Sequence, residues 1–214
     1  LQVQGIGKYG LWLSFKGKSP GPRVLFRADM DALPIPETLN IEHASKQTGI
    51  SHKCGHDGHS TILIGLAAHL SQHPPHHGEI GLIFQPAEET GQGAAEMIKH
   101  LPWTIETIDF AYALHNLPGK ALGEVFCKAE LFTPHVSTCI MEWKGMEGHA
   151  ATPELAHHPG KVLQFALNEF GIDQPTGFKS CPVYSMLGAK AYGTSPANAE
   201  LHCTCRAKDT ETFQ

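Results

Sequence analysis

The sequence predicts an α/β protein in which a mainly parallel sheet, covered by helices, is followed by a smaller α+β unit. Before about residue 120, short apolar runs alternate with longer segments that have helical apolar spacing. After residue 133, the runs instead alternate apolar with polar residues. Continuous apolar strands are typical of parallel sheets buried on both faces, whereas alternating strands have one solvated face. The length of 214 residues and a hydrophobic content of 41% are sufficient for both cores.

The first half is expected to contain three strands and two helices. Residues 24–28 form an apolar run bounded by Gly21-Pro22 and Pro34, which indicates a strand. Residues 60–70 are too many for a strand and rich in helix formers, with Ser60 as the expected N-cap. The other expected elements are a strand at 78–84, a helix at 92–101 and a strand at 110–114.

The second half is expected to form one half-buried strand, one helix and two further strands. In the strand at 137–144, one face carries Cys139, Met141 and Trp143. A helix opens at Pro159-Gly160, and strands follow at 183–187 and 200–206. The change of pattern places a domain boundary near Thr133-Pro134, which gives domains 1–133 and 134–214.

Composition excludes several classes of function. The net charge of -5 is spread along the chain, so no basic face is available for nucleic acid or for a membrane surface. No segment has the length of a membrane span, and the first residues lack a charged-then-apolar leader, so we expect a cytoplasmic protein. The six cysteines are not needed as disulfide staples, and Cys203 and Cys205 are expected in the core of one strand face.

The segment from His52 to His59 contains the densest group of metal-binding residue types. It places three histidines and Cys54 within eight residues, and two glycines let the side chains converge. Thiolate and imidazole suit zinc and other late first-row ions, and nearby carboxylates extend the choice toward manganese.

Further polar residues follow each predicted strand of the first half. Asp29 and Asp31 follow the first strand, the Glu88-Glu89 pair follows the second, and His115 ends the third. Open α/β sheets bind ligands at the carboxyl ends of their strands, so these side chains are expected to meet there. One glutamate of the pair can bind a metal while the other takes a proton from water. Asp31 or Asp57 can orient a ligating imidazole through its second nitrogen.

Five motifs in this order, RADMDALP, HKCGHDGH, IFQPAEE, ALHN and GMEGHAATP, resemble the M20 metallopeptidase family. The resemblance is strongest to its amidohydrolase branch, which includes hippurate, N-acyl-amino-acid and auxin-conjugate hydrolases. It implies a catalytic domain at 1–133 with two divalent ions, zinc or manganese. It also implies a lid at 134–214 that mediates homodimerisation, and a substrate that is an N-acyl amino acid or a short peptide.

The resemblance also implies roles for individual residues. The implied metal ligands are Cys54, His56, Glu89 and His115. The implied catalytic residues are Glu88, as general base, and His149, which polarises the scissile carbonyl. Asp31 matches the acidic residue beneath the metals, and Asn198 and Arg206 match substrate-binding residues of the lid.

Some features depart from the family pattern. Lys53 stands where relatives have a small residue, and Asn198 is followed by Ala199-Glu200 rather than by an apolar-Pro-Asp continuation. The chain is expected to be truncated at both ends, lacking an N-terminal helical segment and a last histidine ligand. Two alternatives stay open: a dipeptidase or aminopeptidase of the same family, and a non-catalytic metal-binding or dimerisation module. Glu88 separates the second alternative, because a purely structural site has no use for a base.

Overall fold

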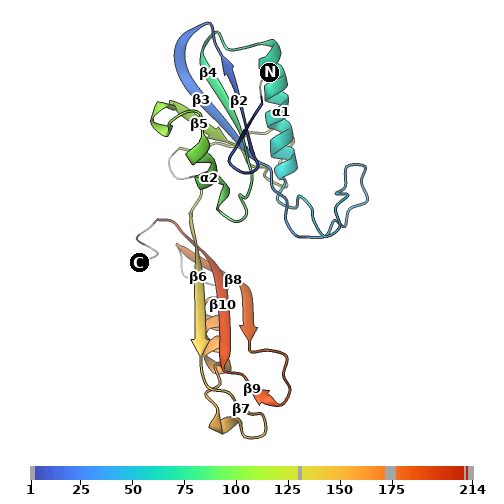
Figure 1. The fold of residues 1–214 in the computed structure, drawn as a ribbon, viewed down its shortest axis with the longest axis vertical. Helices are drawn as coiled ribbons and strands as arrows, with labels where there is room; N and C mark the ends of the chain where they lie inside the picture. The colour runs from blue at the N-terminus through green and yellow to red at the C-terminus, as the bar shows by residue number, and fades with distance from the viewer. Residues whose placement is uncertain (1–2, 130–131, 172–176, 210, 212–214) are drawn as a thin grey trace. The chain divides into compact units, whose positions relative to one another are not determined.

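The computed structural model describes residues 3–129, 132–171, 177–209 and 211 (Figure 1). The chain forms two compact units, Leu1–Leu122 and Gly123–Gln214. This division falls ahead of the boundary that the sequence suggests at Thr133-Pro134, and Lys128, Phe132, Thr133 and Pro134 line a pocket together with residues of β8 and β10. Within the described residues, no helix is both long and apolar enough to cross a membrane.

The first unit contains a five-stranded sheet with the order β1-β2-β4-β3-β5. The strands are β1 (Gln4–Ile6), β2 (Gly10–Lys16), β3 (Ser19–Asp29), β4 (His77–Gln85) and β5 (Phe110–Ala113). β3 pairs in parallel with β4 and β5, whereas β2 is antiparallel to both β1 and β4. The sheet is therefore mixed rather than mainly parallel. The three strands expected from the sequence are the parallel ones, and β1 and β2 were not predicted.

Two helices cover the two faces of this sheet. α1 (His56–Gln72) buries Leu63, Ala67 and Leu70 against one face, beside Leu82 of β4. α2 (Gly93–His100) covers the other face, where Met97 joins a second cluster that includes the side chains of β1, β2 and Trp103. A short 3-10 helix, η1 (Ile105–Thr107), precedes β5. Each fully buried Leu-sized side chain contributes about 1.5–3 kcal/mol, so both helices are fixed to the sheet that supports the site.

The start of α1 differs from the prediction in a way that matters for function. The helix begins at His56, with Gly55 as N-cap at φ 91°, rather than after Ser60. The Ser60 hydroxyl instead donates to the carbonyl oxygen of Asp29 at 2.8 Å. A Cβ on Gly55 would lie 2.8 Å from the Asn116 side chain, so glycine is required both by the backbone and by this close approach.

The second unit is a three-stranded antiparallel sheet with one helix on it. β10 (Asn198–Ala207) lies between β6 (His135–Lys144) and β8 (Phe178–Leu187). α3 (Gly160–Glu169) packs on the face that carries Leu201, Cys203 and Cys205. This confirms the core position predicted for the two cysteines. The remaining elements are β7 (Gly148–His149), η2 (Pro153–Leu155) and β9 (Thr194–Ser195), with β7 paired to β9.

Candidate metal centre

His56 occupies the first position of α1, and its side chain is completely buried. Its Nδ1 lies 3.0 Å from the carbonyl oxygen of Asp31 and 3.2 Å from Asp31 Oδ1. Donation from Nδ1 to Asp31 leaves the lone pair on Nε2, and this buried atom has no hydrogen-bond partner among the described residues. A buried acceptor without a partner is costly, and a cation bound at Nε2 would remove that cost.

Three carboxylates converge on the same nitrogen. His56 Nε2 lies 3.7 Å from Asp29 Oδ2, 3.8 Å from Glu88 Oε2 and 3.7 Å from Glu89 Oε1. The side chains of Glu88 and Glu89 are 39% and 27% exposed, so the site opens to solvent on their side. Like charges this close repel each other, and a cation among them would turn that repulsion into attraction.

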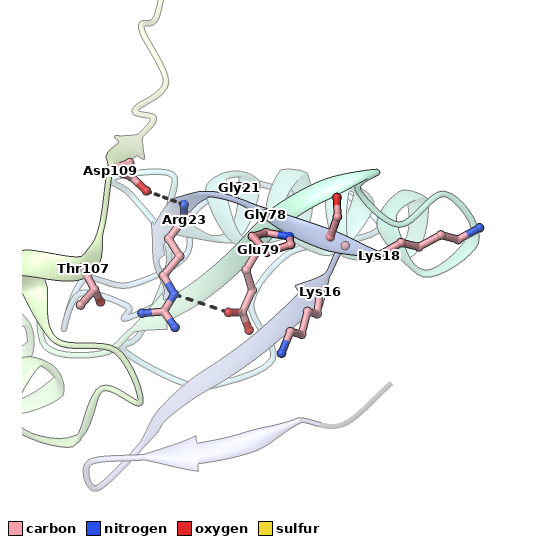
Figure 2. A pocket seen from close by; sticks show the side chains of 11 residues that line it. Lys16, Lys18, Gly21, Arg23, Gly78, Glu79, Thr107 and Asp109 are labelled. Atoms are coloured by element: carbon pink, nitrogen blue, oxygen red, sulfur yellow. Dashed lines mark hydrogen bonds and ion pairs between the residues drawn. The ribbon is translucent and has the colours of Figure 1, made fainter.

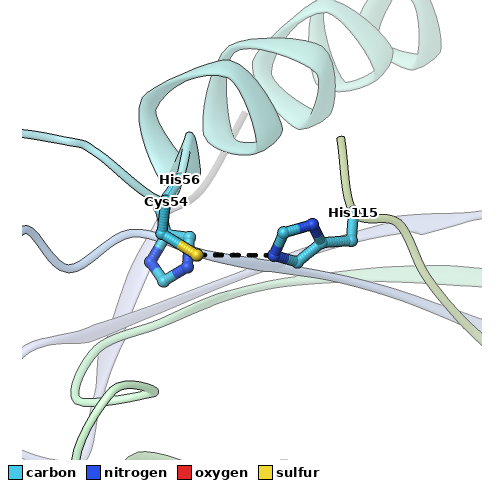
Figure 3. A group of neighbouring side chains, drawn as sticks. All are labelled: Cys54, His56 and His115. Atoms are coloured by element: carbon cyan, nitrogen blue, oxygen red, sulfur yellow. Dashed lines mark hydrogen bonds between the residues drawn. The ribbon is translucent and has the colours of Figure 1, made fainter. Parts of the chain in front are cut away.

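Cys54 and His115 add sulfur and nitrogen donors from two different loops (Figure 3). Cys54 Sγ lies 3.5 Å from His115 Nε2, and the donor atoms of Cys54, His56 and His115 are all within 4.8 Å of one another. The same limit holds for His56, Glu88 and Glu89. These two groups contain the four predicted metal ligands and the predicted base.

The Cys54 thiol responds to this environment. Burial, followed by the negative charge of Glu89 and Glu88, raises the pKa of Cys54 to about 11. Without a cation the thiol therefore stays protonated near neutral pH, whereas a bound divalent ion would stabilise the thiolate. Sulfur, imidazole and carboxylate donors together fit zinc, and the carboxylate share also admits manganese.

Asp29 and His59, which are both buried, form a hydrogen-bonded network with the exposed Asn116. Asp29 is 1% exposed and accepts hydrogen bonds from Arg27 Nη1 at 2.8 Å and from His59 Nδ1 at 2.6 Å. Burial alone would raise the pKa of Asp29, but the His59 hydrogen bond and the Arg27 charge outweigh burial and lower it. His59 Nε2 accepts the backbone N–H of Asn116 at 2.8 Å.

Both ring nitrogens of His59 are therefore engaged, which leaves it as a support rather than a ligand. By holding Asn116, His59 fixes the segment that presents the neighbouring His115. The signal in the sequence was Asp29 itself, because a carboxylate ending an apolar strand is rare unless it has partners.

The turn that carries the two glutamates is shaped by Ala87, whose φ is +52°. This left-handed conformation is uncommon for a residue with a Cβ, and it occurs immediately after Pro86 and before the carboxylate pair. The backbone N–H of Glu89 then donates to Asp31 Oδ2 at 3.1 Å. Asp31 thus contacts both His56 and the glutamate turn. The alternative orienting residue, Asp57, is exposed and accepts its hydrogen bond from Gly58 instead.

A loop at 33–51 joins the segment of Asp31 to that of Cys54. The two ends of the loop form an antiparallel bridge, with Leu33 N–H to Ser51 O at 3.0 Å and Ser51 N–H to Leu33 O at 3.1 Å. Lys53, beside Cys54, places its Nζ 2.5 Å from Glu37 Oε1 on the loop. The Lys53 charge is thereby directed at the loop.

The other three predicted residues lie in the second unit. His149 is exposed in β7, and its Nδ1 accepts the backbone N–H of Ala151 at 3.1 Å. Asn198 and Arg206 stand at opposite ends of β10. At about 3.3 Å per residue their Cα atoms are about 26 Å apart, so one small molecule cannot contact both residues of the same chain.

A separate cavity of about 620 Å³ lies at the amino end of β3, at the other end of the strand from Asp29 (Figure 2). Arg23 Nε lies 3.6 Å from Glu79 Oε2, and the Arg23 backbone N–H donates to Asp109 Oδ2 at 2.7 Å. No histidine or cysteine occurs among the described residues that line it. The metal-binding residue types thus gather at the carboxyl end of the sheet, where the sequence places them.

Comparison with known proteins identifies the family. Residues 25–204 match the model of peptidase family M20/M25/M40. The chain belongs to this family. The M20 membership confirms the family predicted from the motifs. It also agrees with the fold, because the chain superposes over its full length on a Bacillus subtilis protein described as a dinuclear metal binding peptidase from the M20 family, with a TM-score of 0.72 and 27% identity.

Two curated M20-like relatives are deacetylases. An N-acetyl-L-cysteine deacetylase of Bacillus subtilis is 40% identical over 153 residues, which is 71% of this chain and 36% of the relative. An N-acetyldiaminopimelate deacetylase of Geobacillus is 36% identical over 157 residues, covering 73% of this chain and 41% of the relative. The chain thus spans about two fifths of the length of these relatives, and 56% of the M20 peptidase structure.

Proposed function

We propose that the whole protein is a metal-dependent hydrolase that cleaves the amide bond of N-acyl amino acids. The observation that carries the proposal is the buried, unpartnered His56 Nε2, with the carboxylates of Glu88 and Glu89 both within 4 Å. The amide-cleaving activity of the two deacetylase relatives supports the substrate class.

Cys54, His56, Glu89 and His115 would hold two divalent ions, zinc or manganese, together with any ligand contributed by other parts of the protein. When bound, such ions lower the pKa of a water molecule and polarise a carbonyl oxygen. Asp31 would orient His56 through Nδ1, and Asp29 with His59 would hold the segment of His115 in place.

Glu88 is the proposed general base. It sits among the candidate ligands and is the more exposed of the two glutamates, so its carboxylate can reach a water molecule that enters from solvent. Glu88 would accept a proton from that water during attack on the amide carbonyl and deliver it to the departing amine.

The second unit is proposed to act as a lid and homodimerisation domain over 134–214. His149 accepts a hydrogen bond at Nδ1, which leaves the ring proton on Nε2 and lets the exposed imidazole donate to a carbonyl oxygen. Asn198 and Arg206 are proposed to contact substrate. Because they are far apart on β10, they would serve different ends of the lid, as an arrangement with two sites per dimer allows.

The test combines metal content with turnover of N-acetyl amino acids in the full-length protein. Glu88→Gln is expected to retain metal by elemental analysis and to lose at least about a hundredfold in kcat. Cys54→Ala is expected to lose metal, and the exposed Asp57→Asn serves as the matched control that changes neither quantity. Full turnover by Glu88→Gln would eliminate the proposed base. Hydrolysis of dipeptides in preference to N-acetyl amino acids would instead assign the protein to the peptidase alternative.

A further inference from the structure

Two cysteines of the second unit lie directly opposite each other on neighbouring strands. Cys139 of β6 and Cys203 of β10 are register partners in an antiparallel pair. Both belong to the hydrophobic cluster beneath α3, so their side chains share one face of the sheet. Both are free thiols. They form a pair that the proposed amide hydrolysis does not use.

Strand register distinguishes this pair from the other cysteines of the sheet. Directly opposed residues of antiparallel strands have Cα atoms about 4.5–5.5 Å apart, and a disulfide spans Cα separations of about 4.4–6.8 Å. Cys205 is diagonal to Cys139, which corresponds to about 7–8 Å and exceeds that range. Cys181 is exposed and lies opposite Thr204 instead. Among the described residues of this sheet, Cys203 is therefore the cysteine placed to bond Cys139.

The two thiols differ in exposure, which sets the order in which they react. Cys139 is half-buried, whereas Cys203 is 0% exposed. Burial, followed by the neighbouring thiols of Cys205 and Cys139, raises the pKa of Cys203. A dissolved oxidant therefore reacts poorly with Cys203 and reaches Cys139 first.

The backbone beside Cys203 is paired irregularly on the side away from Cys139. The register between β10 and β8 shifts between His202 and Cys203, and the β8 partner of Cys203 is Pro182, which has no N–H to donate. Opposed Cβ atoms are about 4.5–5.5 Å apart, and a disulfide needs about 3.5–4.5 Å, so the strands must approach by about 1 Å. Weaker pairing with β8 lowers the cost of moving Cys203 toward β6.

We propose that Cys139 and Cys203 are an oxidative modification site, at which hydrogen peroxide produces a reversible disulfide. The Cys139 sulfur attacks one peroxide oxygen, the O–O bond breaks, and the products are a sulfenic acid and one water. The Cys203 sulfur then attacks the sulfenic sulfur, the S–O bond breaks, and the hydroxide leaves with the Cys203 proton as a second water. Two thiols are thus oxidised and one peroxide is reduced to two waters. Proximity of the two sulfurs offsets the low reactivity of the buried thiol.

The bond would join the central strand β10 to the edge strand β6 of the second unit. In a reducing compartment a disulfide of this kind is transient and forms only while the oxidant is present. The inference is independent of the proposed hydrolysis, because the candidate metal donors belong to the first unit.

Peptide mapping after oxidation tests the pair. The reduced full-length protein is treated with hydrogen peroxide, its remaining thiols are alkylated, and its tryptic peptides are analysed by mass spectrometry without reduction. We expect a cross-link between the peptide of Cys139 and the peptide that contains both Cys203 and Cys205, and dithiothreitol should remove it. Oxidation of Cys139 to a sulfinic or sulfonic acid with no cross-link would overturn the proposal.

Variants assign the bond within the shared peptide. Cys139→Ala and Cys203→Ala should each lower the yield of the cross-link by at least about tenfold, whereas Cys205→Ala should change it by less than about twofold. Cys181→Ala, at an exposed position of β8, is the matched control. Circular dichroism checks folding, and the half-buried Cys139 provides a test even where Cys203→Ala fails to fold. A cross-link to this peptide that is lost in Cys205→Ala, or retained in Cys203→Ala, contradicts the pairing.

Discussion

Lys53 shows how one departure from a family pattern is accommodated next to a metal-ligand candidate. Its ammonium contacts Glu37 on the 33–51 loop, and Glu37 also accepts the backbone N–H groups of Thr38 and Leu39. The hydrogen bond from Lys53, followed by that from Leu39, lowers the pKa of Glu37 to about 2. The extra cation is thus compensated within the loop.

This pairing leads to a prediction for Lys53→Met. In the wild type the Glu37 carboxylate should titrate near pH 2, and in the variant its pKa should rise toward about 4.5. A lowered pKa in the folded state stabilises it above the unfolded pKa, and this contribution is lost as pH falls from about 4.5 to about 2. Carbon-detected NMR of the Glu37 side-chain carboxyl measures its pKa in both proteins. A Glu37 pKa that is the same in both proteins would show that the ion pair is absent in solution.

At the scale of single residues, the sequence identified the candidate metal ligands better than the residues that hold those ligands in place. Cys54, His56 and His115 are marked by residue type and motif, and the structure brings their donor atoms together. Their roles remain proposals. The hydrogen bond between the buried Asp29 and His59 was not predicted, because it joins residues far apart in the chain, which residue type alone does not reveal.

Among the elements, the turn from Pro86 to Gly93 holds the one residue other than glycine that has a positive φ in the described part of the chain. Ala87 adopts φ +52°, and a Cβ on Gly93 would lie 1.6 Å from the carbonyl oxygen of Pro86. The turn therefore requires glycine at position 93, and it holds Ala87 in a conformation that glycine adopts more easily. This geometry directs Glu88 and Glu89 back toward α1.

We expect the two substitutions at Ala87 to differ in the size of their effect on the free energy of unfolding. Ala87→Gly should change the free energy of unfolding by less than about 1 kcal/mol, because relieved strain offsets the added chain entropy. Ala87→Val should lower it by about 1–3 kcal/mol, because a β-branched residue disfavours positive φ. Urea unfolding measures both, with Ala68→Val on the exposed side of α1 as the control. A valine tolerated equally well at both positions would argue against the left-handed conformation.

The elements themselves were largely predictable from apolar spacing, and the misses have physical reasons. The expected strands at 24–28, 78–84 and 110–114 are present as β3, β4 and β5. β2 was missed because its continuous apolar run, Leu11 to Leu13, is only three residues long before polar residues interrupt it. The first turn of α1 was missed because its histidines and glycines have no apolar periodicity and form part of the site.

The whole chain consists of two units with separate hydrophobic cores. Side chains of α1 and α2 pack with β1 to β4 in the first unit, whereas α3 packs with β10 in the second. The candidate metal donors all belong to the first unit, and the pocket lined by Lys179, Arg206 and Lys208 belongs to the second. Ligands of each unit should therefore stabilise that unit selectively.

Differential scanning calorimetry of the full chain tests this separation. Zinc at a hundred times its Kd should raise the Tm of one transition by about 10 °C, and a chelator should reverse the shift. Leu201→Ala, which leaves a cavity in the second core and costs about 2–5 kcal/mol, should lower the Tm of the other transition. A single transition that responds to both changes would show that the units unfold together.

The bridge between Leu33 and Ser51 makes the spacing of the residues on either side of the 33–51 loop independent of the length of the loop. Two backbone hydrogen bonds close the loop at its base, so the distance between Asp31 and Cys54 does not depend on how many residues lie between them. Adding residues to a loop costs little once its ends are joined. This makes the loop the part of the first unit where evolution, or an engineer, can insert and delete residues while leaving the chemistry below it unchanged.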